Sequence, residues 1–209
     1  LGVNLLPYDG KLCSFDCIYC ECGFNRDFRT KTKLPDRENV YAALEDKLQS
    51  LRGQNVQLDV ITFAGNGEPT MHPEFSAIID DTISLRNRFA PEAKISVLSN
   101  GMNVGKTPVF AALKKVENPI LKLDSAFDET VRLIDRPNSP NYSVARQVEL
   151  YKKFRGNFIL QTMFLKGEFE GRRVDNSSEK EVSAWLELVR ALSPREVMIY
   201  TIDRETPAK

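Results

Sequence analysis

Residues 58–83 read LDVITFAGNGEPTMHPEFSAIIDDTI and contain one complete strand–turn–helix unit. Apart from Asp59, Leu58 to Phe63 is an apolar and β-branched run, which is typical of strands buried on both faces. The glycine-rich turn at 65–67 ends this strand, and apolar residues at 75, 78, 79 and 83 then recur at the spacing of one helix face. The stretch therefore predicts a β-strand followed by an α-helix, the repeating unit of α/β proteins.

The same alternation extends along the chain in both directions. A helix is predicted from Pro35-Asp36 to a C-cap glycine at Gly53, and Ser178 with Glu181 predicts a capping box on the last helix. The other predicted strands cover residues 1–6, 94–98, 120–124, 158–165 and 197–202, and the other helices cover 108–115, 142–154 and 178–189. Such alternation gives parallel strands, either as a barrel or as a doubly wound sheet, and both architectures place ligands at the carboxyl ends of the strands.

Length and charge narrow the class of protein. The chain has 209 residues, and its 29 basic and 29 acidic side chains cancel, so no bulk positive field attracts nucleic acid. No apolar run approaches the roughly 20 residues that span a bilayer. We expect a cytoplasmic protein with no membrane partner and a single domain over residues 1–209. Because the sequence begins at Leu1 without methionine, truncation of this domain at one or both ends is left open.

The four cysteines lie within ten residues, at Cys13, Cys17, Cys20 and Cys22, directly after the first predicted strand. Clustered thiols favour metal binding over disulfides in a reducing compartment. Three cysteines at unequal short spacings suit an iron–sulfur cluster with one iron left open for chemistry. We interpret Cys22 as a nearby thiol. The alternatives are a non-catalytic iron–sulfur electron carrier and a zinc-binding module.

Polar residues also follow the later strands. Asn66, Gly67 and Glu68 follow the strand at 58–63, and Ser99 and Asn100 follow the next strand. Lys122 and Asp124 stand two residues apart, so they share one face of their strand. A charged pair in an apolar strand needs a polar interior or a ligand, and the alternative is a buried ion pair. Met163 is interpreted as a ligand contact or a core residue.

The cysteine spacing and the turn together resemble the signatures of a known family. Cys-x3-Cys-x-Tyr-Cys, with Tyr19 before the third cysteine, resembles the radical SAM signature, and Gly65-Asn66-Gly67-Glu68-Pro69 resembles the Gly-Gly-Glu-Pro motif of that family. Ser-Asn-Gly, Arg136-Pro137-Asn138 and Tyr-Thr-Ile-Asp-Arg204 extend the resemblance to one branch, the Fe–S oxidoreductases related to the tRNA wyosine-forming enzymes.

This resemblance implies a partial, six-unit βα barrel of the radical SAM type. It implies a [4Fe–4S] cluster on Cys13, Cys17 and Cys20, reductive cleavage of S-adenosylmethionine to a 5′-deoxyadenosyl radical, and an external electron donor such as flavodoxin or ferredoxin. The cofactor-binding residues that we predict are Tyr19, Asn66, Gly67, Glu68, Ser99, Asn100, Lys122, Asp124 and Met163. The resemblance does not identify the substrate. A tRNA is a possible partner, but the net charge of zero does not support it.

Three further features have predicted roles outside the cofactor site. His72, the only histidine, precedes a helix and is interpreted as a cap or surface group, not as a catalytic residue. The glycine- and charge-rich stretch at 166–176 is predicted to be a mobile cover. Asp203 and Arg204, after the last strand, are predicted to meet the substrate.

Overall fold

The computed structural model describes residues 1–25, 32–203 and 206. Within these ranges, six parallel strands form one sheet in the order β1-β2-β3-β4-β5-β8, and β6 and β7 form a separate antiparallel pair. The strands of the large sheet are β1 (Gly2–Val3), β2 (Val60–Phe63), β3 (Lys94–Ser99), β4 (Asn118–Lys122), β5 (Ile159–Met163) and β8 (Glu196–Tyr200). The hairpin consists of β6 (Lys166–Phe169) and β7 (Arg172–Asp175).

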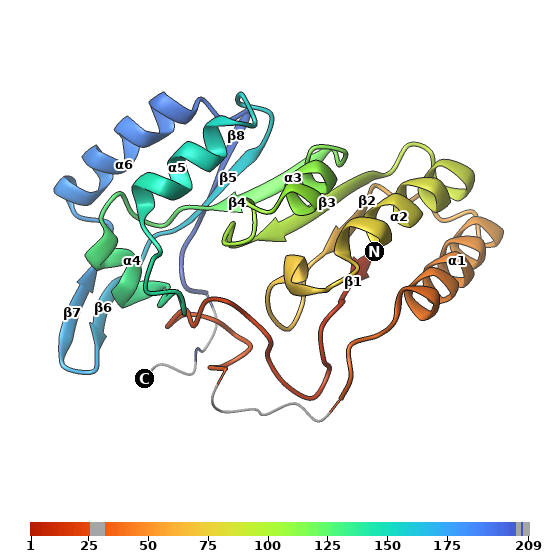
Figure 1. The fold of residues 1–209 in the computed structure, drawn as a ribbon, viewed down its shortest axis with the longest axis horizontal. Coiled ribbons are helices and arrows are strands. Elements are labelled where there is room, and N and C mark those ends of the chain that lie inside the picture. The colour runs from red at the N-terminus through yellow and green to blue at the C-terminus, as the bar shows by residue number, and fades with distance from the viewer. Residues whose placement is uncertain (26–31, 204–205, 207–209) are drawn as a thin grey trace.

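Helices connect successive strands of the sheet (Figure 1). They are α1 (Arg37–Gly53), α2 (Phe75–Phe89), α3 (Thr107–Leu113), α4 (Asp128–Ile134), α5 (Val144–Lys152) and α6 (Glu179–Leu192), with a short 3-10 helix at Pro69–Met71. Because the strand order follows the sequence order, crossovers of one hand place the helices on one face of a curved sheet. The predicted α/β partial barrel is confirmed. None of the helices in the described ranges is both long and apolar enough to cross a membrane.

The main core lies between the sheet and its helices. The strand residues that point to the helices are fully buried: Ile61, Phe63, Ile95, Val97, Leu121 and Leu160. On the opposite face of β2, Val60 and Thr62 are only half-buried. The prediction of a strand buried on both faces was therefore wrong, because no helix of the described ranges covers the concave face of the partial barrel.

Tertiary contacts also changed several local predictions. The left-handed residue after α1 is Asn55, with φ of 55°, not Gly53. The capping box was wrong, because Ser178 makes no side-chain capping bond and Glu181 accepts instead from the hydroxyls of Ser125 and Thr130. Helix α4 was not predicted, and the stretch at 166–176 forms the β6–β7 hairpin.

Candidate functional site

The cysteine loop begins where the chain pairs with the glycine-rich turn after β2. The Leu12 amide donates to the Asn66 carbonyl at 2.9 Å, and the Glu68 amide donates to the Leu12 carbonyl at 3.0 Å. Gly67 permits this pairing because its φ is 141° and a Cβ there would lie 1.8 Å from the Leu12 carbonyl oxygen. The two sequence motifs are thus joined by main-chain bonds immediately before Cys13.

The substitution Gly67→Ala is expected to lower the free energy of unfolding by about 1–3 kcal/mol and to separate the cysteine loop from the turn. The strained φ and the close Leu12 carbonyl both oppose a side chain at this position. Chemical denaturation measures the change. Gly53→Ala is the matched control, because a Cβ at that helical position meets nothing within 4 Å and should stabilise the chain by about 0.5–1 kcal/mol. Equal effects of the two substitutions would contradict this account.

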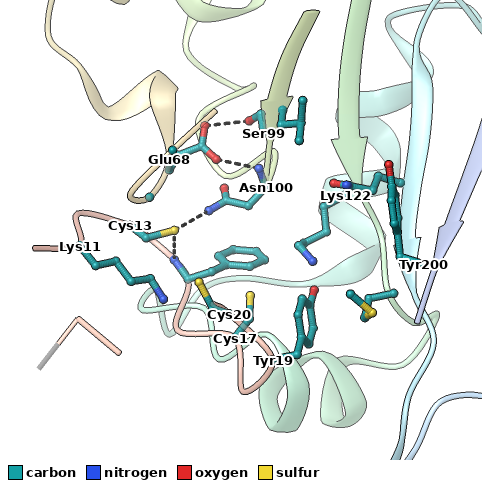
Figure 2. A pocket seen from close by; sticks show the side chains of 16 residues that line it. Lys11, Cys13, Cys17, Tyr19, Cys20, Glu68, Ser99, Asn100, Lys122 and Tyr200 are labelled. Atoms are coloured by element: carbon teal, nitrogen blue, oxygen red, sulfur yellow. Dashed lines mark hydrogen bonds between the residues drawn. The ribbon is translucent and has the colours of Figure 1, made fainter. Parts of the chain in front are cut away.

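Beyond this junction the strand ends and the cysteine loop enclose a cavity of about 270 Å³ (Figure 2). Its lining comes from the cysteine loop and five strand ends: Lys11, Cys13, Phe15, Cys17, Tyr19, Cys20, Gly65, Gly67, Glu68, Leu98, Ser99, Asn100, Lys122, Gln161, Met163 and Tyr200. All the predicted cofactor and metal residues except Asn66 and Asp124 belong to this lining. The structure therefore gathers most of the predicted site in one place.

The three signature thiols have different surroundings. The Cys13 sulfur accepts from the Phe15 amide at 3.4 Å and from the Asn100 amide group at 3.6 Å, and Cys17 donates to Asp135 at 3.4 Å. Burial raises the pKa of Cys13 to about 11 and that of Cys17 well above its usual value. A hydrogen bond with Cys22 lowers the pKa of Cys20 to about 6.

The donor set fits an iron–sulfur cluster. All four cysteines are free of disulfides, and amide groups donate to the Cys13 sulfur, as they do to cluster ligands. Within the described residues, no three Cys, His, Asp or Glu side chains come close enough to share one metal ion. A four-iron cluster instead takes each thiolate on a separate iron, so its ligands stand farther apart than those of a single ion.

Lys11 and Lys122 flank the thiols on opposite sides (Figure 2). Lys11 is 4% exposed, donates to the Gly23 carbonyl at 2.8 Å and lies 3.4 Å from Asp16. Burial lowers the pKa of Lys11, but the nearby thiolates and Asp16 outweigh burial and raise it overall. A cationic Lys11 offsets the negative charge that thiolates bring into the cavity. No sequence pattern distinguished this lysine from the other basic residues.

Glu68 is a buried carboxylate that connects the turn to the end of β3. One oxygen accepts from the Thr70 amide and hydroxyl and from the Ser99 hydroxyl at 2.9 Å, and the other accepts from the Asn100 amide at 2.7 Å. Burial raises the pKa of Glu68, while these donors act against the rise. The second oxygen carries a single donor, which leaves this side of the carboxylate able to accept from a ligand in the cavity.

Lys122 and Asp124 form the buried ion pair that the sequence allowed, and a second acid joins them. The Lys122 ammonium lies 2.8 Å from Asp124 and 3.6 Å from Asp135. The Tyr19 hydroxyl donates to both carboxylates, and the Lys122 ammonium lies 4.5 Å from the centre of the Tyr19 ring. Asp135 was missed because it follows a helix and belongs to no strand end. Its only signal was its position next to the Arg-Pro-Asn stretch.

The residues that lie outside the cavity have structural partners. Asn66 donates to the Pro7 carbonyl at 3.1 Å, and Asp124 is enclosed by Lys122, Tyr19 and the Met163 amide. His72 is buried, not on the surface. Its ring bonds the Pro35 carbonyl at 2.8 Å and accepts from the Glu74 amide. These three side chains form hydrogen bonds with the backbone of the segments that surround the site.

The prediction for the segment after β8 is only partly within the described ranges. Asp203 is exposed and is not among the residues that line the cavity. Arg204 lies outside the described residues. Tyr200, at the end of β8, does line the cavity and was given no role from the sequence.

Comparison with known proteins places this geometry in a family. A sequence model of the radical SAM superfamily matches residues 9–176, which is most of the chain. The chain belongs to the radical SAM superfamily. Enzymes of this superfamily use a [4Fe–4S] cluster and S-adenosylmethionine, and this radical SAM chain places its three signature cysteines in the cavity lining.

Similar proteins are longer than this radical SAM chain. A Brachyspira hyodysenteriae protein named GTPase Obg is 28% identical over 209 residues, which cover 99% of this chain and 28% of that protein. Streptococcus suis SuiB bound to S-adenosylmethionine shares the fold with a TM-score of 0.67 at 15% identity, over 100% of this chain and 42% of SuiB. TYW1 with a lysine-pyruvate adduct has a TM-score of 0.62 at 15% identity, over 97% of this chain and 65% of TYW1. The chain thus spans less than two thirds of each.

Proposed function

We propose that Cys13, Cys17 and Cys20 hold a [4Fe–4S] cluster and that this chain cleaves S-adenosylmethionine reductively to abstract a hydrogen atom from a substrate. When bound, the cluster supplies the electron that releases a 5′-deoxyadenosyl radical, after reduction by an external donor such as flavodoxin or ferredoxin. The observation that carries the proposal is that the three thiols line the same cavity as Glu68 and the ends of β3, β4 and β5.

The residues of the chain have separate tasks in this proposal. The second oxygen of Glu68 accepts from the ammonium group of S-adenosylmethionine, because it has one protein donor and faces the cavity. Ser99 orients Glu68 through its hydroxyl, and Asn100 orients it through its backbone amide. Met163 and Tyr200 supply apolar surface for the nucleoside. Lys122 keeps its ammonium at the cavity wall between two acids.

The proposal is tested by anaerobic reconstitution with iron and sulfide, reduction with dithionite and addition of S-adenosylmethionine. We expect 5′-deoxyadenosine, detected by mass spectrometry, to form with the reconstituted protein and not with the apoprotein. A protein that carries an intact cluster and yields none, with candidate substrates present, would show that the proposal is wrong.

The two alternatives give different results in the same preparation. A cluster whose electron paramagnetic resonance spectrum does not respond to S-adenosylmethionine indicates an electron carrier. Stoichiometric zinc without iron or sulfide, in protein isolated anaerobically, indicates a zinc-binding module. The net charge of zero gives no general attraction for tRNA, so small molecules and peptides are the first substrates to test.

A further inference from the structure

The cysteine loop has a second main-chain partner besides the glycine-rich turn. The segment 134–138, which begins at the last residue of α4, runs along the loop. The Ile18 amide donates to the Ile134 carbonyl at 2.9 Å, the Asp16 amide to the Asp135 carbonyl at 3.0 Å, and the Asn138 amide to the Ser14 carbonyl at 2.9 Å. These bonds surround Cys17 on both sides, so the segment 134–138 determines the path of the loop between its first two ligands.

Arg136 stands at the centre of this segment in an unusual backbone conformation. Its φ is 49°, which is disfavoured for a residue with a side chain and persists only where neighbouring contacts require it. The guanidinium carbon lies 5.3 Å from the ring centres of both Phe24 and Phe169. Phe24 belongs to the end of the cysteine loop, and Phe169 belongs to β6. The guanidinium therefore contacts two aromatic rings that are distant in sequence.

The hairpin that carries Phe169 packs on the cysteine loop and is anchored at its base. A small apolar cluster, separate from the main core, joins the loop, α4 and the hairpin through Ile18, Phe24, Ile134, Leu165, Phe169 and Val174. Asn176, which is 1% exposed, donates to the Asp124 carbonyl at 2.8 Å and to the Met163 carbonyl at 2.7 Å. It also accepts from the Leu165 amide at 2.8 Å. The hairpin is thus joined to the ends of β4 and β5 at the cavity.

We propose that Arg136 is a positioning residue that joins the cysteine loop to the β6–β7 hairpin through its guanidinium, and that this contact keeps the three thiols in the arrangement that receives the cluster. The inference rests on the proposed function only in naming the cluster as what the loop receives. Arg136 is not part of the cavity lining, so it acts through the loop and not on the substrate.

Hydrogen–deuterium exchange of the metal-free full chain tests the contact without any cluster. Arg136→Ala should speed exchange of the amides at residues 12–24 by about tenfold while the amides of α2 keep their rates. Arg136→Lys, which keeps the cation, should restore part of the protection. Phe169→Leu should also speed exchange in the same loop. The exchange rates of the double variant should be only slightly higher than those of either single variant, because both substitutions remove the same contact. Arg146→Ala, on the exposed side of α5, is the matched control and should change nothing in the loop.

A second measurement addresses the cluster itself. In the reconstituted protein, Arg136→Ala should release iron to a chelator several times faster than the unsubstituted chain, and Arg146→Ala should not. The positioning role would be overturned if Arg136→Ala left exchange at residues 12–24 unchanged, or sped it equally in α2 and in the loop. It would also be overturned if the effects of Arg136→Ala and Phe169→Leu were additive. If the unsubstituted chain binds no iron, the proposed function fails, and the exchange result still decides whether Arg136 holds the loop.

Discussion

Replacing any one of Cys13, Cys17 or Cys20 by alanine is expected to abolish formation of 5′-deoxyadenosine. A [4Fe–4S] cluster with three protein ligands has none to spare, since its fourth iron must remain open to S-adenosylmethionine. The iron and sulfide content of each reconstituted variant and the yield of 5′-deoxyadenosine measure the effect. Each of the three thiols lines the cavity, so the three variants should fail alike.

Cys22→Ser provides the matched control for these three variants. The Cys22 sulfur bonds the Gly65 carbonyl at 3.6 Å and is not among the residues that line the cavity. This variant should keep its iron, its sulfide and its product. Loss of the cluster in Cys22→Ser, together with its retention in Cys13→Ala, would mean that the ligands have been assigned wrongly.

Replacing Lys122 by methionine is expected to lower the free energy of unfolding by about 3–5 kcal/mol. The substitution keeps an unbranched side chain but removes the cation that lies between Asp124 and Asp135, whose side chains are 0% and 2% exposed. Urea denaturation of the metal-free chain measures the loss. Lys115→Met is the matched control, because its pair with Asp80 is exposed and should contribute less than about 1 kcal/mol.

The pH dependence of the Lys122→Met variant has a definite sign. Burial, and then Asp124, raise the pKa of Asp135 above its ordinary 3.8 in the folded chain. A group with a raised folded pKa binds more protons folded than unfolded, so it favours folding more strongly as the pH falls toward 3.8. Without Lys122, Asp135 holds its proton more tightly, so the loss of stability in the variant should become smaller as the pH falls from 7 to 5. A constant deficit over this range would contradict an electrostatic origin.

Much of the fold could be predicted from local patterns. Apolar runs predicted β2 and β3, and helical spacing of apolar residues predicted α1 and α2. These patterns show which side chains face the core, and each pattern lies within one short segment of sequence. The ends of these elements were less predictable. Gly53 is the last residue of α1 and not its C-cap. Ser178 stands at the N-cap of α6 without a side-chain bond, and Glu181 accepts instead from hydroxyls of a different unit of the fold. Distant partners of this kind leave no local pattern.

The sequence by itself determined which thiols are available and that a glycine-rich turn follows β2. Their spacing is local, and Gly67 is needed because the backbone at that point accepts no side chain. Only the tertiary structure decided what surrounds the thiols. Asp135 reaches Cys17 across 118 residues, and Lys11 and Tyr200 enter the same cavity from the two ends of the chain. The physical reason is that parallel strands bring their carboxyl ends to one edge, so side chains meet there by sheet order and not by distance along the chain.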